Sequence, residues 1–110
     1  LPVHYSISAA YIPTPSGQVL GVSKLCRLVE ILARRPVLQE QLMEDITSSL
    51  MKLRGCEGAA CIGSGIHYCL RMRGVKQSRS VIVTSSLKGA FLDDATARAE
   101  FMQLAGGSKR

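Results

Sequence analysis

The chain has 110 residues, of which 46% are hydrophobic and 20% are charged, and its formal net charge is +6 at pH 7. This length accommodates one domain, and the hydrophobic content excludes an intrinsically disordered chain. No apolar run approaches the roughly 20 residues of a membrane-spanning helix, so we expect no membrane partner. The opening Leu1-Pro2-Val3-His4 has no initiator Met and no signal-like apolar region, which is typical of a chain cut from a longer one.

Four cysteines occur without a Cys-x-x-Cys pair, at Cys26, Cys56, Cys61 and Cys69. Such sparse usage favours free thiols in a reducing compartment, so we expect a cytoplasmic protein. The positive net charge is compatible with a nucleic-acid surface, a site for an anionic substrate, or a merely soluble exterior. Charge by itself does not choose among these three.

The N-terminal third predicts a strand followed by a helix. Residues 3–8 alternate apolar and polar side chains, which predicts a half-buried strand that ends near Ile12. Prolines and a glycine within residues 13–17 then predict a turn and a loop. Ser23 is expected to cap a helix over 24–35, in which leucine and valine recur at helical spacing.

The middle of the chain predicts a second helix and two strands. Pro36 suits the first turn of a helix that ends near Arg54. The apolar stripe of this helix is expected to be Leu38, Leu42, Ile46, Leu50 and Leu53. Two strands over about 59–73 and 79–88 follow, and residues 74–77 are expected to form the turn between them.

A last short helix is expected near the C-terminus, capped by Asp93 or Asp94. Its apolar side is expected to consist of Ala97, Phe101 and Leu104. The predicted order is therefore strand, helix, helix, strand, strand and short helix. This order indicates an α+β fold with helices on one face of a small antiparallel sheet, and we expect one domain over residues 1–110.

The second of these strands contains a row of chemically active side chains at alternate positions: His67, Cys69, Arg71 and Arg73. Strand geometry sends alternate residues to one face, where imidazole and thiol suit a metal and guanidinium suits an anion. A plain basic sheet face with an incidental cysteine accounts for the same spacing. One His-x-Cys pair falls short of the three or four ligands that zinc takes.

Two further groups lie at the expected helix starts. Lys24 and Arg27 share a helix face beside Ser23, and free N–H groups with the positive end of the helix dipole suit a phosphate there. A capped helix with solvated cations is the alternative. Gln39 and Glu40 open the second helix, where the carboxylate either accepts hydrogen bonds from a guanine-like edge or only stabilises the helix start.

Several motifs resemble the GTP cyclohydrolase I family in order and spacing. They are Tyr11-Ile12-Pro13, residues 19–30, residues 35–40, residues 67–75, Val83-Thr84-Ser85 and Arg98-Ala99-Glu100-Phe101. The resemblance implies the tunnelling fold, in which two antiparallel helices cover a sheet that neighbouring subunits extend into a barrel. It also implies a homo-oligomer, pentameric or decameric, with active sites at subunit boundaries.

The activity implied by the resemblance is hydrolysis of GTP to dihydroneopterin triphosphate and formate, in folate or pterin biosynthesis. The same resemblance assigns roles to single residues. Cys69 corresponds to one of three zinc ligands, and His67 corresponds to an acid/base histidine beside the metal. Gln39 and Glu40 correspond to the guanine-recognition pair. The ribose and triphosphate contacts correspond to Ser23, Lys24, Arg27 and Arg73.

The chain departs from the family's pattern in three places. The other two zinc ligands and a second catalytic histidine belong to a Cys-Glu-His-His stretch that would precede Leu1 and is absent from these 110 residues. Ser64 and Gln41 stand where the family usually has an acidic residue and an arginine. We therefore expect the C-terminal part of a GTP cyclohydrolase I, which is incomplete alone.

Two other classes of protein stay open as alternatives. One is a non-catalytic homologue that serves as an oligomeric, purine-nucleotide-binding scaffold. The other is a small basic RNA-binding domain, which the net charge of +6 permits. The three Tyr and two Phe residues form no stacking platform, so we expect no nucleic-acid partner.

Overall fold

The structure, a computed structural model, describes the backbone of residues 3–71 and 76–107 and the side chains of residues 6–65 and 83–106. Three strands form an antiparallel sheet in the order β1-β2-β3. The strands are β1 (Val3–Pro13), β2 (Cys56–Arg71) and β3 (Lys76–Gly89). The helices are α1 (Val22–Ala33), α2 (Gln39–Met51), α3 (Ala90–Asp93) and α4 (Ala95–Gly107).

The sheet has a hydrophobic core on each face because consecutive residues of β2 point to opposite sides. On one face α2 packs against β2, and the fully buried cluster is Leu42, Met43, Ile46, Leu50, Ala59 and Cys61. On the other face α3 and α4 cover the sheet with Phe91, Phe101 and Ala105 around Ala60. The rings of Phe91 and Phe101 meet edge to face, with centroids 5.6 Å apart.

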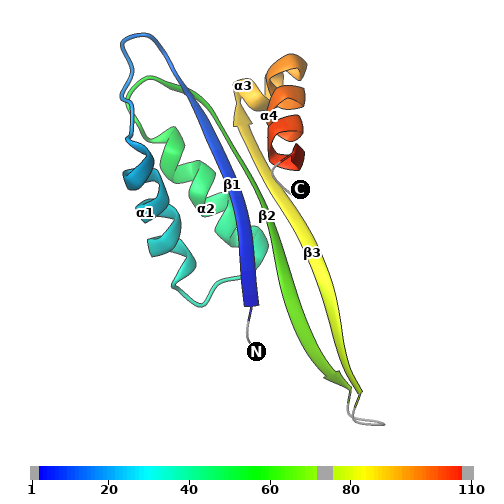
Figure 1. The fold of residues 1–110 in the computed structure, drawn as a ribbon. Coiled ribbons are helices and arrows are strands. Elements are labelled where there is room, and N and C mark those ends of the chain that lie inside the picture. The colour runs from blue at the N-terminus through cyan, green and yellow to red at the C-terminus, as the bar shows by residue number, and fades with distance from the viewer. Residues whose placement is uncertain (1–2, 72–75, 108–110) are drawn as a thin grey trace.

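The α+β class and the order of the elements agree with the sequence-based expectation, but the placement of the last helix does not. Figure 1 shows α1 and α2 on one side of the sheet and α4 on the other. The two predicted antiparallel helices therefore lie on one face, as expected, but the expectation of helices on one face does not extend to α4, which covers the other. The apolar side chains Ala10, Ile12 and Ile62 face away from α2 and need a cover of their own.

The start of α1 also differs from the prediction. Gly21, rather than Ser23, is the N-cap residue, and no side chain caps the helix. The backbone N–H groups of Lys24 and Leu25 both donate to the carbonyl oxygen of Gly21, at 3.1 Å. The helix therefore begins at Val22, and Ser23 lies inside its first turn.

The second helix is shorter than expected, since α2 begins at Gln39 rather than near Pro36 and ends at Met51 rather than Arg54. Leu38 is the N-cap residue in an extended conformation, and it is 75% exposed. It therefore does not belong to the apolar stripe. Gln39, the first residue of the helix, is instead buried, and its amide donates to the carbonyl oxygen of Gly63 on β2.

The strands of the β2–β3 hairpin begin earlier than the sequence predicts. β2 begins at Cys56 rather than residue 59, and β3 begins at Lys76, which pairs with Arg71. Part of the expected turn therefore belongs to a strand. The rest of the expected turn, residues 74–75, and the predicted strand end at residues 72–73 lie outside the described residues.

The C-terminal helix is a 13-residue helix rather than a short one. Asp94 caps it, since its Oδ1 accepts a hydrogen bond from the N–H of Thr96 at 2.9 Å, which confirms one of the two predicted caps. The buried stripe contains Phe101 and Ala105, whereas Leu104 is 71% exposed. The prediction for Leu104 was wrong because the stripe continues at a spacing of four residues.

The molecule is elongated, with principal extents of 59 × 27 × 22 Å. In Figure 1 the β2–β3 hairpin runs well past the ends of α2 and α4. Within the described part of the chain, no helix combines the length and the apolar character needed to cross a membrane.

Candidate functional site

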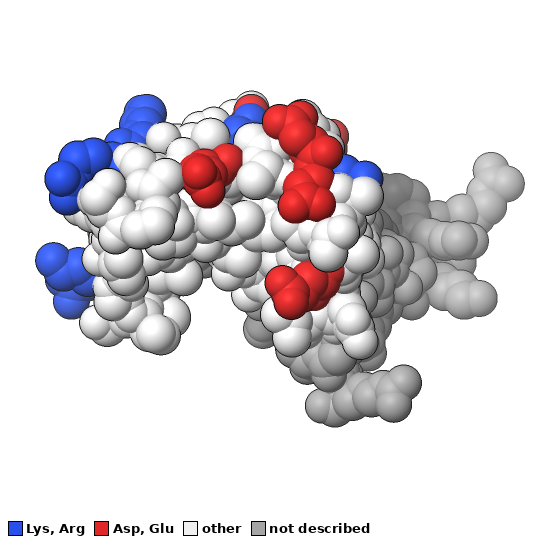
Figure 2. All heavy atoms as spheres, turned by 90° about the horizontal axis from the view of Figure 1, so that it is seen from above, with Lys and Arg blue, Asp and Glu red and all other residues white. Residues whose placement is uncertain are grey.

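An open groove of about 530 Å³ lies along the first turns of α1. It is lined by Ser23, Lys24, Arg27, Leu28 and Ile31. The first turn of α1 contains no acidic residue. Viewed from above, Lys and Arg side chains gather at the left edge of the molecule, on the side where Figure 1 draws α1 (Figure 2). Two cations, a hydroxyl and an uncapped helix start together suit an anionic ligand.

The start of α2 forms a second group, and its two polar residues differ in burial. Gln39 is only 7% exposed, and its Nε2 donates to the carbonyl oxygen of Gly63 at 3.2 Å and to Thr84 Oγ1 at 3.0 Å. Glu40, the next residue, is exposed. The Gln39 amide thus holds the helix start on β2 and β3, and the Glu40 carboxylate lies beside this anchor in solvent.

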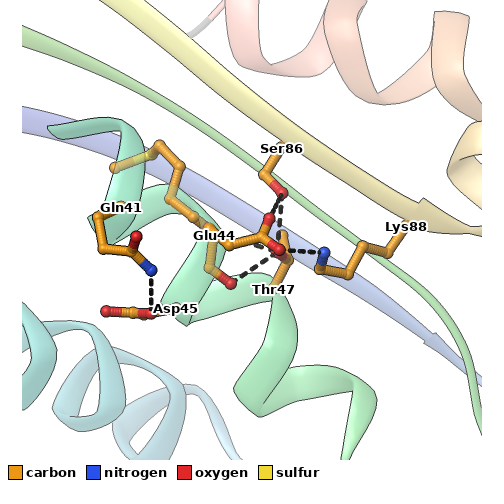
Figure 3. Close-up of polar contacts among 7 residues, drawn as sticks. Gln41, Glu44, Asp45, Thr47, Ser86 and Lys88 are labelled. Carbon is orange, nitrogen blue, oxygen red and sulfur yellow. Dashed lines mark hydrogen bonds and ion pairs between the residues drawn. The ribbon is translucent and has the colours of Figure 1, made fainter.

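A row of polar contacts continues from this anchor along α2 and β3 (Figure 3). Thr47 Oγ1 and Ser86 Oγ lie 2.8 Å apart, and Ser86 donates to Glu44 at 3.2 Å. Lys88 Nζ forms an ion pair with Glu44 at 2.7 Å. The hydrogen bond from Lys88 is the main cause that lowers the pKa of Glu44, and Ser86 adds to it. Alternate residues of β3 therefore hold α2 at one rotation about its axis.

Gln41 has a local role on α2. Its Nε2 donates to Asp45 Oδ1 at 2.9 Å, one turn further along α2. Arg35 forms an ion pair with the other oxygen of Asp45 at 2.7 Å. The Gln41 hydrogen bond and the Arg35 guanidinium both lower the pKa of Asp45. These contacts join the segment after α1 to α2.

The predicted metal and acid/base residues can be placed only by their backbone. His67 pairs with Val3 on β1 and Ser80 on β3, and Cys69 pairs with Ser78. Their side chains, and all of Arg73, lie outside the described parts of the structure. Among the residues that were described, no group of three or more His, Cys, Asp or Glu could hold a metal ion.

Another thiol of β2 is chemically inert. Cys61 is fully buried, and burial raises its pKa to about 12. Its Sγ lies 3.3 Å from the Sδ of Met43 in the α2 core. A thiol with this pKa supplies no thiolate near neutral pH, so Cys61 is a core residue rather than a ligand.

The structure brings the α1 residues together but separates them from the start of α2. In Figure 1, α1 descends from the loop after β1 and α2 returns upward, so the two helix starts lie at opposite ends of the pair. A helix of 12 residues such as α1 is about 18 Å long. The Gln39 anchor at Gly63 is instead four residues along β2 from His67. Within one chain, Gln39 and Glu40 therefore lie towards the His67 end of β2. The cationic groove lies near the opposite end of the α1–α2 pair.

Two residues make polar contacts in the structure although the sequence predicted no role for either of them. Tyr11 bonds to the backbone of Leu20 through its hydroxyl, and Thr84 accepts the Gln39 amide. Their presence in Tyr11-Ile12-Pro13 and Val83-Thr84-Ser85 was the available signal. Spacing did not reveal their partners, which are 9 and 45 residues away.

Comparison with known proteins adds the family. A family model described as GTP cyclohydrolase I matches residues 1–106. A protein named GTP cyclohydrolase 1 from Dehalococcoides mccartyi is 41% identical over 104 residues, which cover 94% of this chain and 55% of the relative. Relatives with this activity in their names from Pseudomonas syringae pv. tomato and Campylobacter lari are 42% and 41% identical, covering 99% and 100% of this chain and 57% of each relative. This chain thus spans a little over half the length of these relatives, and it belongs to the GTP cyclohydrolase I family.

Proposed function

We propose that the protein containing this chain is a GTP cyclohydrolase I, which converts GTP and water to 7,8-dihydroneopterin triphosphate and formate. The observation that carries the proposal is the cationic groove formed by Ser23, Lys24 and Arg27 at the uncapped start of α1. These are the residues that the family resemblance assigns to the ribose and triphosphate. Names of relatives that align over almost the whole chain support the same activity.

The triphosphate is proposed to lie along the α1 groove. Lys24 and Arg27 supply two positive charges one helical turn apart, and Ser23 supplies a hydroxyl. Charge-assisted hydrogen bonds from such groups are stronger than neutral ones. Arg73, which the family resemblance also assigns to the triphosphate, is proposed as a further phosphate contact.

Guanine is proposed to bind at the start of α2. The exposed carboxylate of Glu40 can accept from both the ring N–H and the amino group of the base. Gln39 is proposed to complete this pair, and its buried amide keeps the helix start against Gly63 and Thr84. Recognition of the base would therefore depend on the Glu40 carboxylate and on the contacts of its neighbour Gln39 with the sheet.

Zinc is proposed as the cofactor, with Cys69 as one ligand and His67 as the acid/base group beside it. A zinc site takes three or four protein ligands, and Cys69 is the one that the family resemblance assigns within these 110 residues. The remaining ligands are proposed to come from the Cys-Glu-His-His stretch of the family pattern. When bound, zinc lowers the pKa of its water towards neutrality, which supplies a nucleophile for hydrolysis.

The active site is proposed to form between copies of the chain in a pentamer or decamer. The cationic groove and the Gln39–Glu40 pair lie at opposite ends of the α1–α2 pair in one copy. A second copy that presents its own groove to this pair would bring the two groups together.

A cytoplasmic location is also proposed. The free thiols Cys26, Cys56 and Cys61 agree with it, because a reducing compartment keeps thiols free.

The test is GTP turnover by the natural full-length protein, measured as formate release together with its zinc content. The double variant Lys24→Ala/Arg27→Ala should raise the KM for GTP at least about tenfold because it removes two phosphate-binding charges. Lys52→Ala/Arg54→Ala, which removes two exposed charges outside the groove, is the matched control. GTP binding without zinc or formate release would favour the non-catalytic scaffold, and equal effects of both double variants would reject the groove.

A further inference from the structure

Tyr11 makes an unusual pair of contacts near the end of β1. Its hydroxyl accepts a hydrogen bond from the N–H of Leu20 at 2.6 Å and donates to the carbonyl oxygen of the same residue at 3.2 Å. The phenol is half-buried, and its ring packs against the α2 core. One side chain therefore holds both backbone polar groups of Leu20.

These contacts lead directly to the start of α1. Gly21 follows Leu20, and its carbonyl oxygen accepts the first helical hydrogen bonds from Lys24 and Leu25. No side chain caps this helix, and none of its residues is fully buried. The position of the first turn therefore depends on the segment that precedes it.

That segment is held at its other end by the turn between α2 and β2. The N–H of Thr14 donates to the carbonyl oxygen of Gly55 at 2.8 Å, and the N–H of Gln18 donates to that of Arg54 at 2.7 Å. Gly17 and Gly55 approach so closely that a Cβ on Gly55 would lie 2.7 Å from the Cα of Gly17. The loop between β1 and α1 is therefore attached to the α2–β2 turn at Thr14 and Gln18, and Tyr11 holds its last residues at Leu20.

We propose that Tyr11 is a positioning residue for the triphosphate groove, an inference that rests on the proposed function. Tyr11 does not line the groove formed by Ser23, Lys24 and Arg27. It acts through Leu20 and Gly21, which set where the first turn of α1 begins. Loss of the hydroxyl removes none of the groove residues, but it allows the first turn of α1, which carries them, to move.

The test is the Tyr11→Phe variant of the natural full-length protein. Phe keeps the ring in the core and removes only the two hydrogen bonds to Leu20. We expect the Kd for GTP to rise about five- to tenfold, and the Kd for guanosine, which has no phosphates, to change less than about twofold. The KM for GTP should rise with the Kd while kcat stays within about twofold.

Arg98→Met is the matched control, because it also removes two side-chain hydrogen bonds to the backbone, those to Phe91 and Leu92, but on α4 and on the other face of the sheet. It should lower thermal stability about as much as Tyr11→Phe and leave the Kd for GTP unchanged.

Amide hydrogen exchange tests the position of α1 independently of GTP binding. In Tyr11→Phe the exchange of Leu20, Lys24 and Leu25 should accelerate, and that of α2 should not.

An equal loss of GTP and guanosine affinity, or no loss of either, would overturn the inference. If the wild-type protein binds no GTP, the proposed function fails, and the exchange pattern alone decides whether Tyr11 positions α1. Unchanged exchange at Lys24 and Leu25 would then reject the positioning role as well.

Discussion

At the scale of single residues, Gln39 joins three elements. It opens α2, and its amide reaches Gly63 on β2 and Thr84 on β3. A buried donor that loses its acceptor costs more than the hydrogen bond itself contributes, because it was already removed from water. The start of α2, where guanine is proposed to bind, therefore depends on the contacts of Gln39 with both neighbouring strands.

We predict that Gln39→Leu and Thr84→Val are energetically coupled. Gln39→Leu should lower the free energy of unfolding by about 1–3 kcal/mol, since it leaves buried acceptors without their donor. The double variant should cost about 1 kcal/mol less than the sum of the single variants. Urea denaturation measures this, and strictly additive effects would show that the two side chains act independently.

The ion pair between Glu44 and Lys88 predicts a weak dependence of stability on pH. Because the folded protein lowers the pKa of Glu44 below 4.5, the pair stabilises the fold above that pH, and the contribution is lost as the pH falls through the lower folded value. The Glu44 side chain is 49% exposed, so solvent screening limits the contribution to about 0.5 kcal/mol.

Glu44→Gln should therefore destabilise the protein slightly at pH 7, and the difference from wild type should vanish in acid. Denaturant titrations at pH 7 and at a pH well below 4.5 compare the two proteins. Glu100→Gln, an exposed carboxylate of α4, serves as the control. A difference that persists unchanged in acid would mean that the carboxylate charge is not its source.

At the scale of elements, the passage from β3 into α3 depends on Gly89. Its φ of 62° and ψ of −129° lie in a region that residues with a Cβ rarely adopt, and a Cβ there would overlap the carbonyl oxygen of Glu57. The chain turns at this point from the sheet to the helices on its second face. Only glycine fits the turn without strain.

Gly89→Ala should destabilise the protein by about 2–3 kcal/mol and lower Tm by several degrees, because it forces a strained backbone. Gly106→Ala is the control, since no atom lies within 4 Å of its Cβ position and the residue is helical. Alanine there should leave stability unchanged or raise it by up to about 1 kcal/mol. Calorimetry that shows equal losses for both variants would contradict the assignment.

The elements could largely be predicted from local patterns. The core positions Leu42, Ile46 and Leu50 and the cap Asp94 were predicted and are confirmed. Helix starts were less accurate: Ser23 was expected as a cap, and Gly21 has that position. Capping signals are only a few residues long, and they do not report contacts from outside the helix such as that between Tyr11 and Leu20, next to the Gly21 cap.

At the scale of the whole molecule, the chain is less compact than a typical domain of its size. Its radius of gyration is 15.8 Å, whereas about 13 Å is usual for this length. The hairpin that projects beyond the helices in Figure 1 accounts for the difference. A small domain with an extended hairpin gains burial if copies associate.

We therefore predict that thermal stability depends on protein concentration. Association that involves only the folded chain raises Tm by mass action, so Tm should increase over a concentration range of about a hundredfold. Sedimentation should show a mass well above the 11.9 kDa of one chain. A single-chain mass with a constant Tm would contradict both the homo-oligomer and a site shared between copies.

The sequence by itself determined the α+β class, the order of the elements and the family, because hydrophobic periodicity and motif spacing are local properties of the chain. It also indicated the cationic groove, whose residues Lys24 and Arg27 lie one helical turn apart. His67, Cys69 and Arg73 stay predictions in their chemical roles.

Only the tertiary structure decided which of these residues meet. It placed α4 on the second face of the sheet, joined Gln39 to partners 24 and 45 residues away, and set the cationic groove and the Gln39–Glu40 pair at opposite ends of two helices. It also revealed the bond from Tyr11 to Leu20. The physical reason is that such contacts depend on how elements pack against one another, whereas periodicity reports only which side of each element is apolar.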